Sequence, residues 1–306
     1  MDGIEVVALA KRFGARTAVE GLSFEVRQGE VFGLLGPNGA GKTTTVRMLS
    51  ALLSPSEGEA RVCGLSLRED GERLRQVVGL LTEHPGLYDR LSGKENLLFF
   101  IKLNELDERK AWPRAEHYLA RFGLAGREHD ACGTYSKGMR QKLAIVRALV
   151  HDPKVIFLDE PTSGLDPESA RTVRDAVAEL AAEGRTIVLC SHNLVEVERL
   201  CARVAVVKNR LLRVAEVSEL RREGFALELT VEGEAARYLA PVRALPFAPT
   251  SSAQGRLLKV LLSNEEQAPE VVAALVRAGA RVYAAHRATR PLEEVYLELV
   301  REETAP

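Results

Sequence analysis

The sequence lacks a long hydrophobic run, a large net charge and a signal peptide, and each absence excludes a class of protein. No uninterrupted apolar run approaches the roughly 18 residues that a membrane-spanning helix needs. The formal net charge is −1, so no global basic field predicts binding to nucleic acid or anionic lipid. The N-terminus lacks the basic start and apolar core of a signal peptide, which predicts a cytoplasmic protein.

Paired cysteines are also missing. The four cysteines are Cys63, Cys132, Cys190 and Cys201. They form no CxxC pair, so we expect buried small hydrophobic side chains, not a disulfide framework or a zinc site. The length of 306 residues predicts two domains, and the apolar fraction of 46% is ordinary for a soluble globular chain.

Two glycines separated by four residues and followed by Lys-Thr predict a P-loop. We assign ATP binding to Gly36, Pro37, Asn38, Gly39, Ala40, Gly41, Lys42, Thr43 and Thr44. The glycines let backbone N–H groups point at the β-phosphate, and a helix beginning near Gly41 adds its positive end. Lys42 can reach the β- and γ-phosphates, and the Thr43 hydroxyl is placed to bind Mg²⁺. A buried strand at 30–35 and a helix at 44–52 flank the motif as a P-loop requires, so we expect a nucleoside triphosphate to bind.

A second motif ends an apolar run with two adjacent carboxylates. Residues 155–158 predict a buried parallel strand, whose carboxyl end is where α/β sheets bind ligands. Asp159 is expected in the Mg²⁺ shell, and Glu160 as the general base that polarises the attacking water. The alternative, an acidic loop after a strand, explains less because the P-loop and the carboxylates account for each other.

The pattern of elements predicts an α/β fold. Alternating residues at 4–9 and 22–26 predict half-buried antiparallel strands, followed by strands at 60–63 and 77–81. Residues 92–124 read as helical, with Pro113 at a helix start. The order of strand 155–159, helix 168–183 and strand 186–190 predicts a parallel sheet.

Composition shifts after about residue 219, so we expect a nucleotide-binding domain at 1–219 and an accessory domain at 220–306. The tail alternates strands at 225–231, 256–262 and 281–285 with helices at 234–239 and 269–278, and a terminal helix begins at Leu292. Prolines and Ser251–Gly255 predict a loop within it. This order predicts a small α+β, ferredoxin-like domain.

The chain resembles the ATP-binding cassette (ABC) ATPases, the nucleotide-binding subunits of ABC transporters, over about residues 4–215. The motifs that carry the resemblance are the signature-like 135–141 ahead of a helix at 141–150, the D-loop-like 163–166, His192 after a strand, and Phe13. The resemblance implies a P-loop NTPase core with a mixed sheet, an antiparallel β subdomain and a helical subdomain at about 84–150.

The same resemblance implies roles for these residues. Ser136, Gly138 and Asp166 are expected to bind ATP, and His192 to hydrogen-bond the γ-phosphate as a catalytic residue. Phe13 is expected to stack on adenine; the alternative is a core phenylalanine.

In this family the signature caps the ATP that the other subunit binds. One chain carries one P-loop and one signature, so the resemblance implies a homodimer around two ATP molecules. It also implies a separate transmembrane permease that holds the chain at the cytoplasmic face of the membrane. The tail sequence at 292–299 and the signature variant resemble multidrug and antibiotic exporters, so ATP-driven export is expected.

Two departures from the family pattern stand out. Tyr135, Lys137 and Met139 replace usual signature residues, which predicts altered affinity with function retained. Glu83 stands where glutamine commonly contacts Mg²⁺. A carboxylate ligates Mg²⁺ at least as well as an amide, so Glu83 is expected as a metal ligand. A solvent-facing loop glutamate is the alternative.

Competing functions are a soluble ABC ATPase acting on ribosomes or nucleic acid, and a plain NTP switch such as a GTPase. The first usually has two cassettes and basic linkers, or a long coiled coil between P-loop and signature. Here 94 positions separate Lys42 from Ser136, without heptads. The signature and the D-loop argue against a GTPase. The tail is either a dimer-stabilising spacer or a regulatory domain; Tyr283 and His286 are expected to be solvated rather than to bind a ligand.

Overall fold

The computed structural model describes residues 3–222, 225–247, 249–288, 292–293 and 295–296. Contacts divide the chain into two compact units, Met1–Ala215 and Glu216–Pro306. The division lies four residues before the boundary that the sequence predicts after residue 219.

The first sheet of the N-terminal unit is antiparallel. Its strands are β1 (Ile4–Phe13), β2 (Arg16–Val26), β4 (Glu57–Val62) and β5 (Leu65–Ser66), in the order β2-β1-β4-β5. Alternate residues of β1 and β2 are buried in the core that also contains Phe32 and Met48. The predicted antiparallel β subdomain is therefore confirmed.

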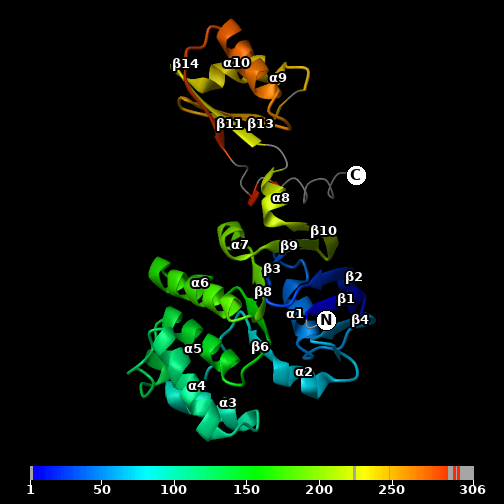
Figure 1. Ribbon diagram of the computed structural model, residues 1–306, viewed down its shortest axis with the longest axis vertical. Helices are drawn as coiled ribbons and strands as arrows, with labels where there is room; N and C mark the ends of the chain where they lie inside the picture. Colours follow the sequence, from blue (N-terminus) through cyan, green and yellow to red (C-terminus); the bar gives the residue numbers. More distant parts are fainter. Residues whose placement is uncertain (1–2, 223–224, 248, 289–291, 294, 297–306) are drawn as a thin grey trace. The chain divides into compact units, whose positions relative to one another are not determined.

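A six-stranded sheet forms the centre of the same unit (Figure 1). Its strands are β3 (Val31–Leu35), β6 (Val78–Leu81), β7 (Val155–Asp159), β8 (Thr186–Ser191), β9 (Arg203–Lys208) and β10 (Arg210–Glu216), in the order β10-β9-β3-β8-β7-β6. The pairs β3–β9, β3–β8, β7–β8 and β6–β7 are parallel. Because parallel strands end at one edge, the residues that follow β3, β7 and β8 meet there.

Helices connect these strands. They are α1 (Lys42–Leu49), α2 (Gly71–Val77), α6 (Pro167–Ala182) and α7 (Leu194–Leu200). Between β6 and β7 lies a helical group of α3 (Gly93–Leu103), α4 (Glu108–Arg121), the 3-10 turn Cys132–Thr134 and α5 (Lys137–Leu149) (Figure 1). Among the described residues, none of the helices has the length and apolar character needed to cross a membrane.

Two predicted helix starts are wrong, because side-chain caps decide where these helices begin. Pro113 lies inside α4, which begins at Glu108 after Asp107, whose carboxylate accepts the Arg109 N–H at 3.0 Å. The helix predicted from residue 141 begins at Lys137, because the Ser136 hydroxyl accepts the Met139 N–H at 3.2 Å.

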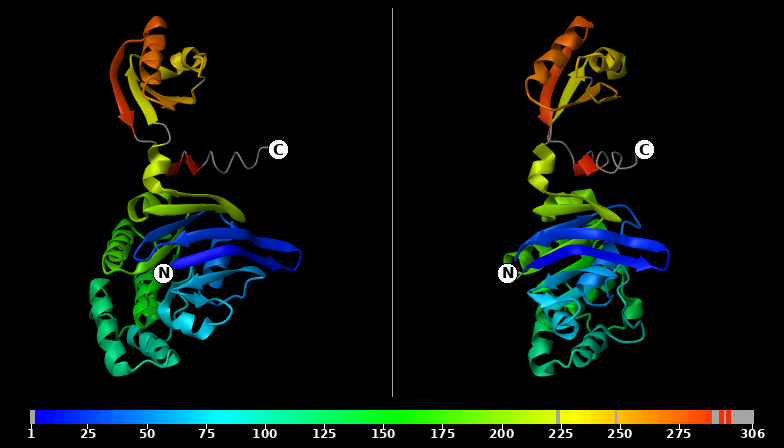
Figure 2. Two further views of the ribbon diagram at one scale, coloured as in Figure 1. Left: turned by 45° about the vertical axis from the view of Figure 1, so that its right-hand side comes forward. Right: turned by 90° about the vertical axis from the view of Figure 1, so that its right-hand side faces the viewer.

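The C-terminal unit is α+β. Its elements are α8 (Val217–Arg222), β11 (Phe225–Val231), the 3-10 turn Ala235–Tyr238, α9 (Leu239–Arg243), β12 (Ser251–Gln254), β13 (Leu257–Leu262), α10 (Gln267–Arg277) and β14 (Val282–Ala288). The sheet order is β12-β13-β11-β14 with every pairing antiparallel. Leu229 and Val260 of the sheet share one hydrophobic core with Val242 of α9 and Leu275 of α10. Figure 2 shows the helices of this unit beside its sheet. This order of elements confirms the ferredoxin-like prediction.

The sequence missed one strand of this unit. Ser251–Gln254, predicted as a loop, forms β12 and pairs with β13. Gly255, at φ 54°, supplies the left-handed residue that the connection needs. The terminal helix predicted from Leu292 lies for the most part outside the described residues.

Candidate nucleotide site

A cavity of about 460 Å³ opens where β3, β7 and β8 end. Its lining residues come from the start of β2, the P-loop and the start of α1, the loop after β6 that carries Glu83 (the Glu83 loop), and the residues that end or follow β7 and β8. They are Arg16, Ala18, Asn38, Gly39, Ala40, Gly41, Lys42, Thr43, Thr44, Glu83, Asp159, Glu160, Ser163 and His192. The structure thus brings together seven of the nine predicted P-loop residues, all three predicted metal ligands and both predicted catalytic residues.

The P-loop wraps around its lysine. Gly41, immediately before α1, has φ 93°, and a Cβ there would lie 2.6 Å from the Ala18 carbonyl oxygen, so only glycine fits. Lys42 is buried, and its ammonium donates to the carbonyl oxygens of Gly36 at 2.6 Å and Pro37 at 3.2 Å. Gly36 and Pro37 therefore orient the lysine and do not line the cavity.

Thr43 and Asp159 form a second contact across the cavity floor. The Thr43 hydroxyl donates to Oδ2 of Asp159 at 2.8 Å, and Asp159 is only 2% exposed. Burial raises the pKa of Asp159 most strongly, and the charges of Glu160 and Glu83 raise it further. The Thr43 hydrogen bond and Lys42 lower this pKa. A cation placed between these oxygens would relieve the crowding of negative charge.

Glu160 and His192 are in direct contact. Oε1 of Glu160 lies 2.8 Å from Nδ1 of His192 and accepts the His192 backbone N–H at 3.0 Å. Glu160 has φ 52°, a left-handed conformation that is uncommon for glutamate, and its N–H donates to the Cys190 carbonyl at 2.8 Å. This arrangement fixes the carboxylate at the cavity edge and leaves Nε2 of the imidazole for another partner.

Ser136 and Gly138 of the signature and Asp166 of the D-loop lie outside the cavity, although Ser163 at the start of the D-loop lines it. Ser136 caps α5, and Asp166 caps α6 by accepting the Ser169 N–H at 2.9 Å. A Cβ built on Gly138 would lie 2.5 Å from Ser169 Oγ, so the signature packs directly against the start of α6. Ser136, Gly138 and Asp166 are therefore near one another, but the structure does not bring them to the P-loop of the same chain.

Phe13 is also absent from the lining. It ends β1 with its side chain half exposed, and Lys11 lies 5.2 Å from the ring centroid. It is therefore not the core phenylalanine of the alternative interpretation. Sequence reasoning missed Arg16 and Ala18, which the β1–β2 hairpin delivers, and Ser163; only the position of Arg16 just after Phe13-Gly14 hinted at proximity.

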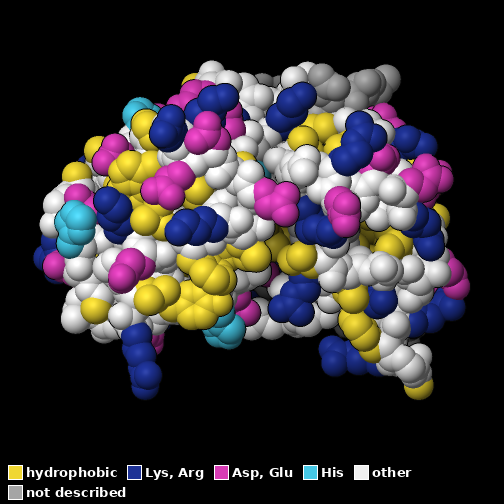
Figure 3. Space-filling model, turned by 90° about the horizontal axis from the view of Figure 1, so that it is seen from below, with side chains coloured by type: hydrophobic (Ala, Val, Ile, Leu, Met, Phe, Trp, Pro, Cys, Tyr) yellow, Lys and Arg dark blue, Asp and Glu magenta, His cyan; other side chains and the backbone are white. Residues whose placement is uncertain are grey.

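A groove of about 310 Å³ lies beside α3 and α5, away from the nucleotide cavity. It is lined by Ser50, Leu52, Arg75, Val78, Leu80, Phe100, Leu103, Asn104, Arg147, Ala148 and His151. Leu52 and Leu103 are exposed although apolar. Figure 3 views the molecule from the end where α2 and α3 lie in Figure 1, and hydrophobic side chains gather on that face.

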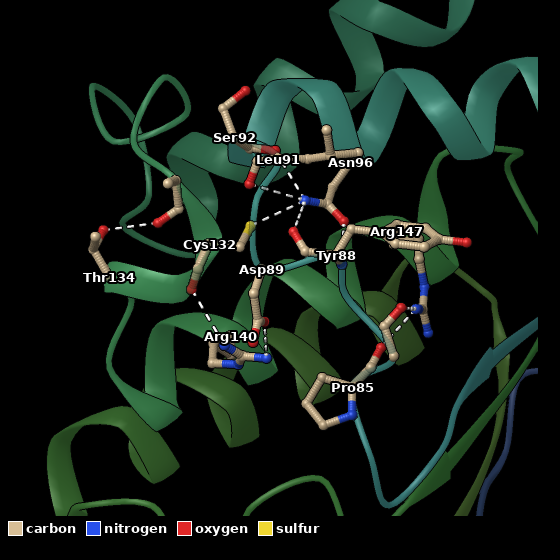
Figure 4. Close-up of polar contacts among 12 residues, drawn as sticks. Pro85, Tyr88, Asp89, Leu91, Ser92, Asn96, Cys132, Thr134, Arg140 and Arg147 are labelled. Carbon is tan, nitrogen blue, oxygen red and sulfur yellow. Dashed lines mark hydrogen bonds and ion pairs between the residues drawn. The ribbon is translucent and has the colours of Figure 1, made fainter.

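Helix α5 anchors the segment that joins the Glu83 loop to α3 (Figure 4). Arg147 donates to the carbonyl oxygens of Pro85 at 2.6 Å and Gly86 at 3.1 Å, and its guanidinium stacks on the ring of Phe100. Arg140 pairs with Asp89 at 2.5 Å. The helix that carries the signature is therefore bonded both to the Glu83 loop and to the wall of the groove.

A buried amide completes this anchoring. Asn96, with no exposed surface, accepts the Tyr88 N–H at 2.8 Å and donates to the carbonyl oxygens of Tyr88, Leu91 and Ser92 (Figure 4). Its amide also donates to Sγ of Cys132 at 3.2 Å. Residues 85–91 thus have a fixed path without forming a helix or strand.

Comparisons with known proteins agree with this fold. Residues 19–163 match the family model described as ABC transporter. The chain is 39% identical to the daunorubicin resistance ATP-binding protein DrrA3 of Streptomyces coeruleorubidus, over 98% of this chain and 94% of the relative. It is 42% identical to a fluoroquinolones export ATP-binding protein of Mycobacterium tuberculosis, over 71% of this chain and 72% of the relative.

A solved structure described as an ATP binding subunit of an ABC transporter superposes with a TM-score of 0.66 at 32% identity, covering 72% of this chain and 92% of that one. The sequence identity, the coverage and the structural superposition all indicate the same family. The chain belongs to the family of ABC transporter ATP-binding proteins.

Proposed function

We propose that this chain binds ATP in the cavity described above, hydrolyses it with Glu160 as general base, and powers export through a separate membrane permease. The observation that carries the proposal is the contact between Glu160 and His192, 2.8 Å apart, at the edge of a cavity whose floor is a P-loop. A carboxylate oriented by an imidazole beside a phosphate-binding loop suits attack of water on a γ-phosphate.

The residues divide the chemistry among them. P-loop N–H groups and the Lys42 ammonium bind the phosphates, and phosphate oxygens would take the place of the carbonyls that Lys42 now contacts. Glu160 accepts the proton of the attacking water. Because Nδ1–H of His192 donates to the Glu160 carboxylate, Nε2 donates to the γ-phosphate when the imidazole carries both protons. Binding and orientation thus come from the loop, and proton transfer from the residues after β7 and β8.

The donor set fits Mg²⁺. Among the described residues no cluster of three His, Cys, Asp or Glu side chains could enclose a metal. Mg²⁺ does not need such a cluster, because it keeps several waters and uses one or two carboxylates with substrate phosphates. Thr43, Asp159 and Glu83 are the residues that would hold it, and the ion supplies positive charge for the phosphates when bound.

A second copy of the chain completes the site in this proposal. Ser136 and Gly138 lie outside their own chain's cavity, so they can contact a phosphate only in another subunit. The N-terminal end of α5 carries the positive end of the helix dipole, which suits that contact. A homodimer of this kind has two equivalent ATP sites.

The groove beside α3 and α5 is the proposed docking surface for the permease. Leu52, Phe100 and Leu103 offer an apolar surface, and Arg75 and Arg147 lie among them. This composition suits an amphipathic helix with one acidic residue. The names of the relatives, daunorubicin resistance and fluoroquinolones export, support export as the direction. Docking would hold the chain at the cytoplasmic face of the membrane.

The test uses tagged Glu160→Gln protein, which should retain ATP because it lacks the base. The protein is captured from separated membrane and ribosome fractions with and without MgATP, and partners are identified by mass spectrometry. We expect a polytopic membrane protein, recovered more strongly with MgATP. Leu103→Glu should abolish its capture, whereas Val276→Glu, at another exposed apolar site on α10, should not. Recovery of ribosomal proteins or nucleic acid in its place would contradict the proposal.

A further inference from the structure

A buried carboxylate lies beneath the two catalytic loops, and neither the sequence motifs nor the proposed chemistry uses it. Glu196, in the first turn of α7, is only 2% exposed. Its Oε2 accepts a hydrogen bond from the Ser191 hydroxyl at 2.9 Å. Its Oε1 is buried and has no hydrogen-bond partner in the part of the chain that the structure describes.

On one side this carboxylate contacts the His192 loop. The Ser191 hydroxyl that donates to Glu196 also accepts the Asn193 N–H at 3.0 Å. Asn193 caps α7 by accepting the Glu196 N–H at 3.3 Å. Hydrogen bonds therefore join Ser191, which precedes His192, to Asn193, which follows it, and Glu196 to both. These bonds fix the backbone of His192.

On the other side the carboxylate contacts the Glu160 loop. Thr162, two residues after Glu160, is largely buried and its hydroxyl adjoins Glu196. Burial raises the pKa of Glu196, the hydroxyls of Ser191 and Thr162 lower it, the charge of Glu160 raises it and Arg174 lowers it. The contacts complete a circuit, because His192 in turn bonds to Glu160.

The position is costly for stability alone. A buried carboxylate with an unpaired oxygen loses solvation that the neighbouring neutral hydroxyls of Ser191 and Thr162 do not restore. An apolar side chain of similar size would pack in α7 at lower cost. The contacts that Glu196 does make all lead to the two loops of the proposed active site.

We propose that Glu196 is a positioning residue that acts through Ser191 and Thr162 to hold His192 and Glu160 in their mutual orientation. The inference rests on the proposed ATP hydrolysis, since the orientation matters only if Glu160 and His192 do the chemistry. Glu196 does not line the nucleotide cavity, so its loss should affect the chemical step and leave nucleotide binding nearly intact.

Steady-state ATPase assays on the full chain separate these effects. Misplacing a catalytic group by about 1 Å can cost on the order of 100-fold in rate. We expect Glu196→Ala to lower kcat by ~10- to 100-fold, with KM for ATP within about 2-fold. Glu196→Gln can still accept from Ser191 and should keep at least about a third of kcat. Glu198→Gln, which changes a carboxylate two residues away on the same helix, should match the wild type.

Ser191→Ala provides an independent variant should Glu196→Ala fold poorly, which thermal melting would detect. Ser191→Ala should lower kcat as Glu196→Ala does, and the double variant should be no slower than the worse single variant, since both interrupt one circuit. Unchanged kcat in folded Glu196→Ala or Ser191→Ala, or additive losses, would overturn the inference. A wild-type chain without ATPase activity would overturn the proposed function instead, so the two failures are distinguishable.

Discussion

His192 contacts Oε1 of Glu160 through two of its atoms. Its backbone N–H donates to this oxygen at 3.0 Å, and Nδ1 of its imidazole lies 2.8 Å from the same oxygen. We expect Glu160→Gln to lower kcat by about 100-fold or more while ATP still binds, because the amide cannot accept the water's proton. Adding His192→Ala should cost little more, since the two residues act as a unit. Single-turnover hydrolysis and nucleotide-binding assays measure both; a Glu160→Gln chain that turns over at a normal rate would refute the base assignment.

Phe13 should contribute to binding and not to chemistry. Its ring is half exposed at the end of β1, three positions before its hairpin partner Arg16, which lines the cavity. Stacking of a base on an aromatic ring is worth about 1–3 kcal/mol, so Phe13→Ala should raise the Kd for ATP by about 5-fold or more. Phe13→Trp should preserve affinity. Equal Kd values for the alanine variant and the wild type in a fluorescent-nucleotide titration would exclude the stacking role.

Glu83 should determine the Mg²⁺ concentration that ATP hydrolysis requires. It lines the same cavity as Asp159, and its charge raises the pKa of that aspartate. Removing the charge with Glu83→Gln should increase the Mg²⁺ concentration that gives half-maximal ATPase, by about 2- to 10-fold, since one anionic ligand near the ion is lost. The measurement is a Mg²⁺ titration at fixed total ATP. An unchanged midpoint would return Glu83 to the role of an ordinary loop glutamate.

Lys137 covers the D-loop glycine. Gly164 has φ 65°, and a Cβ built on it would collide with the Lys137 ammonium group. Gly164→Ala should therefore destabilise the chain by about 1 kcal/mol from its left-handed backbone, while the flexible end of the Lys137 side chain moves aside. Each kcal/mol corresponds to about 2–4 °C in Tm for a unit of this size. Thermal melts measure the loss, and Lys137→Ala should restore little of it; a large recovery would mean that displacing the lysine is costly.

The burial of His151 predicts that the folded chain loses stability in mild acid. Its Nε2 lies 2.9 Å from the Val78 carbonyl oxygen, and its Nδ1 is buried with no hydrogen-bond partner in the described chain. Burial lowers the pKa of His151 below its ordinary value of 6.5. The unfolded chain then binds more protons than the folded one just below that value, so the free energy of unfolding falls as the pH drops through 6.5.

Urea unfolding at pH 7.5 and pH 5.5, on either side of about 6.5, measures this loss. His151→Gln should lose less stability between the two pH values than the wild type does. His129→Gln, at an exposed histidine, is the matched control and should behave like the wild type. Equal losses in all three proteins would exclude His151 as the cause.

The sequence predicted four of the six central strands, β3, β6, β7 and β8, because they are largely buried and appear as apolar runs, as in 155–158 and 187–190. It did not predict β9 or β10, which complete the sheet. The sequence was a poor guide to helix starts that depend on a side-chain cap and to a strand that depends on its neighbouring strand. Asp107, not Pro113, starts α4. Ser251–Gln254 has no apolar alternation and becomes a strand only because β13 lies beside it.

The residues of the candidate site also fall into two groups, those that the sequence identifies and those that only the fold brings to the site. Lys42, Asp159 and Glu160 belong to contiguous motifs and could be read from the chain. Arg16 and Glu196 could not, since a hairpin brings the first to the cavity and contacts with two separate loops define the second.

The anchoring of residues 85–91 also constrains how the chain folds. Arg140 and Arg147 reach this segment from 51 and 62 positions further along the sequence, and Cys132 meets Asn96 across 36 positions. Contacts of such separation form only after the intervening chain has closed a large loop. During synthesis the segment therefore cannot take this path until α5 has left the ribosome, and the connection between nucleotide cavity and groove forms only from that point on.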